Sequence, residues 1–152
     1  MTETAVRSTQ VKDDVPAFSV HKGGTNQTGL PSGSSTKITW PTEEFDTNDN
    51  FASDKFTPTQ SGKYLLCACA QLILAVTGSQ YYISIFKNGS EFKRGEISIP
   101  GAAVDVSTSI SCTVDANGSG DFFEIYLFHN SLVDKDLDGT SARTWFTGIK
   151  VD

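Results

Sequence analysis

GKYLLCACAQLILAV, residues 62–76, is the longest strand-like stretch of the chain and decides its fold. Alternate side chains of a strand point to opposite faces, and here both faces are apolar. A strand with one face in water instead alternates apolar with polar residues. The stretch therefore predicts a central strand covered on both sides, by a partner sheet and by a neighbouring subunit. We assign to the subunit contact the face formed by Tyr64, Leu66, Ala68, Ala70, Leu72 and Leu74, opposite Leu65, Cys67, Cys69 and Ile73.

On either side of this stretch, short runs rich in Val, Ile, Phe, Tyr and Thr are separated by Gly, Asn, Asp, Ser and Pro. This pattern is typical of a sandwich or barrel. Asn88-Gly89 supplies the two positive φ angles of a type I′ turn and predicts a hairpin. About ten strands in one domain fit two packed sheets. The expected strands cover 16–21, 37–40, 55–58, 62–76, 81–87, 90–98, 104–114, 121–129 and 143–151, with loops at 21–35 and 130–140.

The bulk properties set limits on function. A chain of 152 residues is long enough for one domain and one core. Its net charge of −6 argues against nucleic acid as a partner, because phosphate binding needs a basic surface. The longest apolar run is interrupted by Gln71 and too short for a bilayer, so we expect no membrane insertion. Residues 1–15 are polar and predict an N-terminal arm outside a domain at 16–152.

The start of the chain and its cysteines indicate where the protein is made. Met1-Thr2-Glu3-Thr4 opens without the apolar segment of a secretory signal. The cysteines are odd in number, and Cys67 and Cys69 share one face of a strand, where they do not easily bridge. Together with Cys112 they are interpreted as buried thiols of a protein synthesised in a cytoplasm.

Four stretches, in order along the chain, carry a resemblance to a known family. Pro16-Ala17-Phe18-Ser19-Val20 looks like a first strand, and Phe56-Thr57-Pro58 with Ser61-Gly62-Lys63-Tyr64 looks like the turn into a central strand. Gly120-Asp121-Phe122-Phe123-Glu124-Ile125 looks like the entry to the penultimate strand, and Trp145-Phe146-Thr147-Gly148-Ile149 like the last strand. From Pro16 to Asp152 the chain resembles the globular domain of complement C1q and its tumour-necrosis-factor-like relatives.

The resemblance implies an all-β, ten-stranded jelly-roll sandwich and a homotrimer. In that family the first, central and last strands lie in the inner sheet near the three-fold axis, which agrees with the doubly apolar stretch at residues 64–74. The chain departs from the animal recognition proteins because it has no Gly-X-Y collagen repeat and no secretory signal. The family also occurs in bacteria and bacteriophages, and the departures favour the phage members.

These features predict a non-enzymatic structural protein of a bacteriophage virion. It would be a trimeric knob that decorates or cements the capsid, or a small head or tail appendage, made in the host cytoplasm. Its partners would then be other copies of the chain and capsid or tail proteins. The alternative is a receptor-binding head that recognises a host-surface glycan or protein through loops at one end, as part of a fibre or as a bacterial C1q-like recognition module.

No catalytic motif is present in the sequence. His21 and His129 have no nucleophile elbow, no HExxH motif and no cysteine at a known spacing. The glycine-rich stretch that follows His21 lacks both phosphate-loop fingerprints. We therefore expect no enzymatic activity and no organic cofactor.

One acidic loop has part of a calcium-binding pattern. Asp134, Asp136 and Asp138 alternate and are followed by Gly139, as in the first half of a calcium loop. The position of the bidentate glutamate is occupied by Trp145, and no helices flank the loop. Calcium binding by the three carboxylates is therefore one hypothesis, and a solvated acidic loop is the other.

The expected strand at 121–129 carries a candidate binding surface. Phe123, Ile125 and Leu127 lie on one face and are assigned to the core. Phe122, Tyr126 and Phe128 lie on the opposite face, which the resemblance places on the outside of the outer sheet. Exposed aromatic patches mark interaction sites. The three side chains are predicted to dock a partner or, alternatively, to be covered by the protein's own loops.

Overall fold

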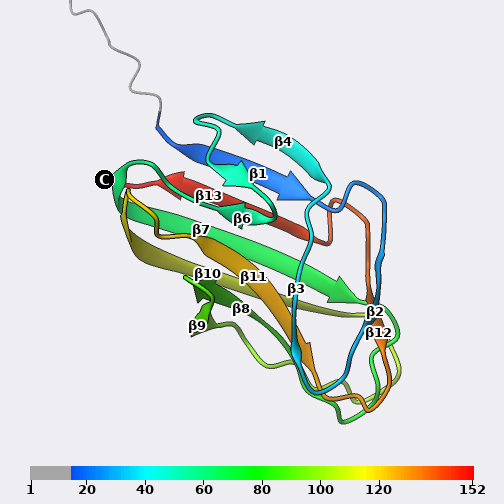
Figure 1. The fold of residues 1–152 in the computed structure, drawn as a ribbon. Helices are drawn as coiled ribbons and strands as arrows, with labels where there is room; N and C mark the ends of the chain where they lie inside the picture. Colours follow the sequence, from blue (N-terminus) through cyan, green and yellow to red (C-terminus); the bar gives the residue numbers. More distant parts are fainter. Residues whose placement is uncertain (1–14) are drawn as a thin grey trace, which may run out of the picture.

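Thirteen strands and no helix make up residues 15–152, the part of the chain that the computed structural model describes (Figure 1). No helix in this part is long and apolar enough to cross a membrane. Of the predicted arm, all residues before Val15 lie outside the described part. The strands are β1 (Ala17–His21), β2 (Gln27–Leu30), β3 (Ser35–Lys37), β4 (Thr42–Asp46), β5 (Phe51–Ala52), β6 (Lys55–Phe56), β7 (Ser61–Leu72), β8 (Tyr81–Lys87), β9 (Ser90–Arg94), β10 (Val106–Asn117), β11 (Phe123–His129), β12 (Lys135–Leu137) and β13 (Trp145–Lys150).

The strands form two packed sheets, as the jelly-roll prediction requires. One sheet has seven strands, and we call it the inner sheet after the corresponding sheet of the C1q and TNF resemblance. Six of its strands follow the order β2-β12-β7-β13-β1-β4, and the seventh, β10, pairs with β7 along its whole length. The outer sheet has six strands in the order β5-β6-β11-β8-β9, with β3 paired to β11. All pairings are antiparallel (Figure 1). The first, central and last long strands of the chain therefore share one sheet.

The two ends of the sandwich differ in what they carry. The Lys150 N–H donates to the Pro16 carbonyl, so the start and the end of the domain lie together. The segments that follow β7, precede β10 and link β11 to β12 gather at the opposite end (Figure 1). There the Ala75 N–H donates to Val104 O at 2.8 Å, and Lys135 Nζ donates to Leu74 O.

An aromatic cluster fills the space between the sheets near the termini. The ring of Phe18 stacks on Phe51 and Phe56, with centroids 5.1 and 4.5 Å apart, and meets Phe146 edge-on at 4.8 Å. Tyr64 adds an edge contact to Phe56 at 5.4 Å. Fully burying one such ring contributes about 1.5–3 kcal/mol to stability. The side chains predicted for the core on β11, Phe123, Ile125 and Leu127, are completely buried, which confirms their assignment.

The face of β7 assigned to the subunit contact lies in the protomer's own core, so that assignment is wrong. Tyr64, Leu66, Ala68, Ala70 and Leu72 are at most 1% exposed within the single chain and point between the sheets. Leu74 lies beyond the end of β7, with a φ of 48° and 59% exposure, and belongs to the loops. A period of two separates the faces of a strand and does not say which face points inward.

The observed strands also differ from the expected ones at short segments. Asn88 and Gly89, with φ of 54° and 79°, form the predicted hairpin turn between β8 and β9. The predicted strand at 37–40 is instead β3, which ends at Lys37. Short strands β2 and β12 lie within the expected loops 21–35 and 130–140 and pair with each other. Strands of two to five residues raise the count from about ten to thirteen, because so few residues give little periodicity to read.

Candidate interaction surfaces

The middle of the solvent side of the inner sheet is neutral, and we call this part the outward face. The charged pair Lys63 and Asp115 continues the same side of β7 and β10 beyond it. The strand register places Cys67 opposite Thr147 on one side and Ser111 on the other. Each of its members is half-buried or exposed in the single chain, and none is charged. They are Leu65, Cys67 and Cys69 on β7, Ser109, Ser111 and Thr113 on β10, and Trp145, Thr147 and Ile149 on β13. Depletion of charged residues is the composition of an interface core.

Large apolar side chains lie at the margin of the outward face. Ile149 is 45% exposed, and Phe45 on β4, opposite Ser19 on β1, is 47% exposed. The exposed apolar area of such phenylalanine and isoleucine side chains leaves water only if another molecule covers it. The contributions of β13 and β4 to this surface were not predicted from the sequence. The signal was available, because Trp145, Thr147 and Ile149 alternate along the last strand.

The three cysteines are free thiols, and each is half-buried. Cys67 and Cys69 belong to the outward face, and the Cys67 thiol lies 3.5 Å from Ser111 Oγ. Burial raises the pKa of Cys69 and of Cys112 above its ordinary value. A thiol with a raised pKa is uncharged at neutral pH and is a poor nucleophile. These cysteines therefore contribute small apolar surface.

The aromatic side chains predicted as a binding patch form stacked pairs with side chains of β8. Tyr126 stacks on Phe86 with ring centroids 4.0 Å apart, and Phe128 stacks on Tyr82 at 4.9 Å. Phe122 lies under Lys55, whose Nζ is 4.7 Å from the ring centroid. Tyr126, Phe128 and Phe122 are half-buried, and their ring faces are used within the protein. The predicted side chains do lie together on the outer sheet, and their partners Tyr82 and Phe86 were not anticipated.

Ion pairs surround these stacked rings. Lys37 Nζ is 2.7 Å from Glu124 Oε1, and this carboxylate is nearly buried. The Arg94 guanidinium lies 4.3 Å over the Tyr82 ring and pairs with Glu91, which also accepts a hydrogen bond from Ser84 Oγ. Hydrogen bonds from Arg94 and Ser84 hold the pKa of Glu91 below its ordinary value. The outer sheet therefore satisfies its own polar and aromatic groups.

The three aspartates of the acidic loop do not meet around a common point. Asp136 Oδ1 accepts the Gly29 N–H at 2.9 Å, and Asp138 pairs with Arg143 at 3.2 Å and accepts the Thr140 N–H. Among residues 15–152 no three carboxylate, histidine or cysteine side chains gather closely enough to hold a metal ion. Alternate spacing is also the period of a strand, and β12 occupies this segment. The geometry does not support the predicted calcium loop at Asp134, Asp136 and Asp138.

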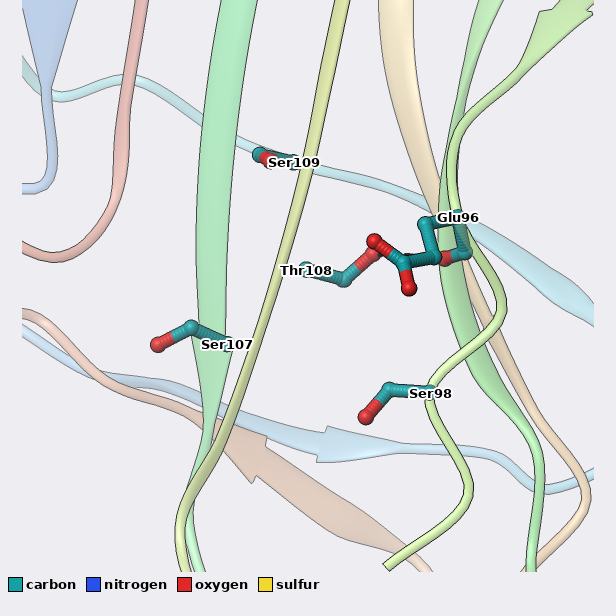
Figure 2. A pocket seen from close by; sticks show the side chains of 5 residues that line it. All are labelled: Glu96, Ser98, Ser107, Thr108 and Ser109. Atoms are coloured by element: carbon teal, nitrogen blue, oxygen red, sulfur yellow. Dashed lines mark hydrogen bonds between the residues drawn. The ribbon is translucent and has the colours of Figure 1, made fainter.

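A polar hollow of about 150 Å³ lies between β10 and the segment that follows β9. Figure 2 shows the Glu96 carboxylate pointing toward Thr108, with serine side chains around the space. The Thr108 hydroxyl donates to the Glu96 carbonyl at 3.0 Å. The lining residues are Glu96, Ser98, Ser107, Thr108 and Ser109. Glu96 is the one titratable side chain among these lining residues, so the hollow lacks the pairing of serine with histidine or lysine that activates a serine nucleophile.

The two histidines lie apart and serve local structure. His21 Nδ1 accepts the Gly23 N–H at 2.9 Å in the turn after β1. His129 is buried at the end of β11, with both ring nitrogens in hydrogen bonds. His129 contacts the Ser131 hydroxyl, and neither histidine lines the polar hollow with its serines.

Comparison with known proteins identifies the class of fold. No protein-family model matches the chain, and no curated protein matches it in sequence. Among solved structures, the globular domain of zebrafish complement 1qA superposes with a TM-score of 0.63 at 16% identity, over 91% of this chain and 98% of that one. Murine APRIL at pH 5.0 gives 0.65 at 15% identity, over 90% and 99%.

A third solved structure extends the same class to insects. Eiger TNF from S. frugiperda superposes with a TM-score of 0.56 at 12% identity, over 91% of this chain and 93% of that one. The chain therefore has the jelly-roll sandwich of C1q and TNF globular domains over nearly its whole length. At such low identity the superpositions establish the fold of this chain and leave its function open.

Proposed function

We propose that this protein is a non-enzymatic, homotrimeric head domain that serves as a structural component of a bacteriophage virion. The outward face of the inner sheet is the contact between its three copies. The head decorates or cements a capsid, or forms a small appendage of the head or tail. Capsid or tail proteins are its further partners.

The outward face is the observation that carries the trimer. It combines neutral side chains from three adjacent strands with apolar residues that remain exposed in a single copy, such as Ile149. The sheet that carries it contains the first, central and last long strands, which the C1q and TNF resemblance places nearest a three-fold axis. A sister copy of the same chain would remove this surface from water at no cost in buried charge.

The free thiols support a virion component over a secreted recognition protein. Cys67, Cys69 and Cys112 form no disulfide, which fits folding in a reducing host cytoplasm. The outer sheet adds a second argument, because it makes its main ion pairs and ring stacks within one chain.

Sedimentation velocity with a matched pair of variants tests the trimer. Ser111→Arg places a charge on the outward face, midway along β10, and Ser90→Arg places the same charge on β9 of the outer sheet. Both serines are exposed in the single chain. We expect trimers for the wild type and Ser90→Arg at micromolar concentration, and folded monomers for Ser111→Arg. A folded monomeric wild type contradicts the trimer.

Cosedimentation tests the virion role separately. The purified wild type is mixed with undecorated capsids of the virus and, in parallel, with cells of the host. Binding to capsids and not to cells supports a decorating or cementing role. Binding to cells and not to capsids supports the alternative, a receptor-binding head for a host-surface glycan or protein, which the partly exposed rings of Phe122, Tyr126 and Phe128 favour.

A further inference from the structure

The loop after β11 holds an apolar residue in an unfavourable backbone conformation. Leu132 has a φ of 63° and is 92% exposed, and the next residue, Val133, is 53% exposed. Leucine rarely adopts the left-handed region, so surrounding contacts must impose it. The Leu132 N–H donates to Ser32 Oγ at 2.8 Å, and the Gly33 N–H donates to His129 O at 2.7 Å. These bonds join the loop at 130–134 to the loop at 31–34.

His129 lies beneath the two loops and holds them together. Its imidazole is 1% exposed and stacks on the Tyr81 ring at 6.0 Å. Nε2 is 2.9 Å from Leu30 O, at the entry to one loop, and Nδ1 is 2.9 Å from Ser131 Oγ in the other. A carbonyl only accepts hydrogen bonds. The Nε2 atom therefore carries the proton of the neutral ring, and Nδ1 accepts from the Ser131 hydroxyl.

A second proton on this ring has two opposing effects. It lets Nδ1 donate to Ser131 Oγ, which frees the hydroxyl for Val133 O, 2.8 Å away. It also places a positive charge in a buried site with no carboxylate in contact. The charge-assisted hydrogen bonds that a protonated ring would donate to Leu30 O and Ser131 Oγ offset only part of the cost of burying a charge with no counter-ion in contact. The charge therefore decides, and the protonated ring favours an open arrangement in which water reaches it.

The charged groups around the ring do not compensate for its burial. Burial is the largest effect and lowers the pKa of His129 below its ordinary value. Lys135, on β12, opposes protonation, and Asp134, in the loop, favours it, so their effects have opposite signs. Tyr81 on β8 contributes an uncharged ring, and the loop at 31–34 contains no titratable side chain. The hydrogen bond to the Leu30 carbonyl raises the pKa, and burial outweighs it, so the closed site favours the neutral imidazole.

We propose that His129 is an acid-sensitive latch that keeps the loops at 31–34 and 130–134 closed at neutral pH and releases them on acidification. Release lets Leu132 leave its left-handed backbone conformation. It also changes the conformation of the loops at the end of the sandwich opposite the termini. Protonation of an open-state histidine with an ordinary pKa near 6.5 raises the open population by up to about 30-fold between pH 7.5 and pH 5.

Amide hydrogen exchange on the full chain tests the latch. Protection factors, corrected for the intrinsic effect of pH, are measured at pH 7.5 and pH 5 for the Gly33 and Leu132 amides. The Gly78 amide, which donates to Pro100 O in another loop, is the internal control. We expect protection at Gly33 and Leu132 to fall by up to about 30-fold, and protection at Gly78 to stay constant.

Two variants and one titration complete the test. His129→Gln removes the titrating group and is expected to abolish the fall in protection, whereas His21→Gln, at the only other histidine, keeps it. If His129→Gln does not fold, NMR titration of the wild-type imidazoles decides the question. Unchanged protection at pH 5 overturns the latch, as does a His129 ring that takes up its proton near pH 6.5 while both loops remain protected.

Discussion

The two surfaces that this sandwich turns to the outside are built differently. The outer sheet covers itself, because Tyr126 and Phe128 stack on rings of β8 and Glu124 is paired with Lys37. The outward face of the inner sheet has no stacked rings and no charges, and it leaves Ile149 45% exposed. Apart from Phe92 on β9, which is 42% exposed, the rings of the outer sheet have partners within one chain. The difference favours the outward face as the contact between copies in the proposed trimer.

The largest expected effect breaks the outer surface. The double variant Tyr126→Ser, Phe128→Ser removes two half-buried rings and both stacked pairs. We expect a loss of about 2–4 kcal/mol in the free energy of unfolding, from lost apolar burial and lost aromatic contacts. The measurement is denaturant unfolding, with sedimentation to follow assembly. A fully stable variant that has lost binding to capsids or cells would instead make these rings a docking site.

The second largest effect on stability is expected at Gly148 on β13, whose neighbour Ile149 belongs to the outward face. A Cβ at Gly148 would lie 2.5 Å from Phe18 Cε1 and 2.6 Å from Leu66 Cδ2. Gly148→Ala therefore overpacks the core, and we expect a loss of about 1–3 kcal/mol. Thermal unfolding measures it. A neutral result would show that the core near Phe18 can rearrange, against the tight packing described here.

The pH dependence of stability tests the hydrogen bonds of Asp121, which lies at the entry to β11. Hydrogen bonds from Asn88 and from Lys87 hold the pKa of Asp121 below its ordinary value. Its folded pKa is the lower one, so its contribution to stability is present above the unfolded value of about 3.9 and is lost as the pH falls below it. We expect stability between about pH 5 and pH 3 to decline less steeply in Asp121→Asn. Equal slopes in urea unfolding would show that the pairing adds nothing.

The smallest effect on stability has the largest effect on assembly. Ile149→Lys changes an exposed side chain on the outward face, so we expect a change within about 0.5 kcal/mol in the unfolding free energy of the single chain. The trimer should nonetheless dissociate, because three lysines would enter an apolar contact. Unfolding of the isolated monomer and sedimentation measure the two quantities. A trimer that tolerates Ile149→Lys would place the contact elsewhere.

The sequence was sufficient to predict the sandwich and its main strands. Residues 62–76 predicted the strand that became β7, and Asn88-Gly89 predicted the hairpin that the φ angles confirm. The sequence did not reveal the direction of each face, because a period of two is symmetric between inside and outside. That is why the core residues Tyr64 and Leu66 were assigned to the subunit contact.

The candidate sites were harder to predict than the strands. The alternation of Asp134, Asp136 and Asp138 fits a calcium loop and a strand equally well, and only the pairing of β12 with β2 distinguishes them. The stacking of Phe128 on Tyr82 depends on the register between β11 and β8, which single-strand periodicity does not contain. Long-range pairing is therefore the information that was missing.

Thiol labelling of the native protein tests the central claim most directly, because Cys67 and Cys69 lie on the outward face. Labelling of Cys67 is read by peptide mass spectrometry at micromolar protein concentration, for the wild type and for Ile149→Lys. Coverage by sister copies predicts that Cys67 resists the reagent in the wild type and reacts in the variant. Equally fast labelling of Cys67 in the two proteins would contradict it.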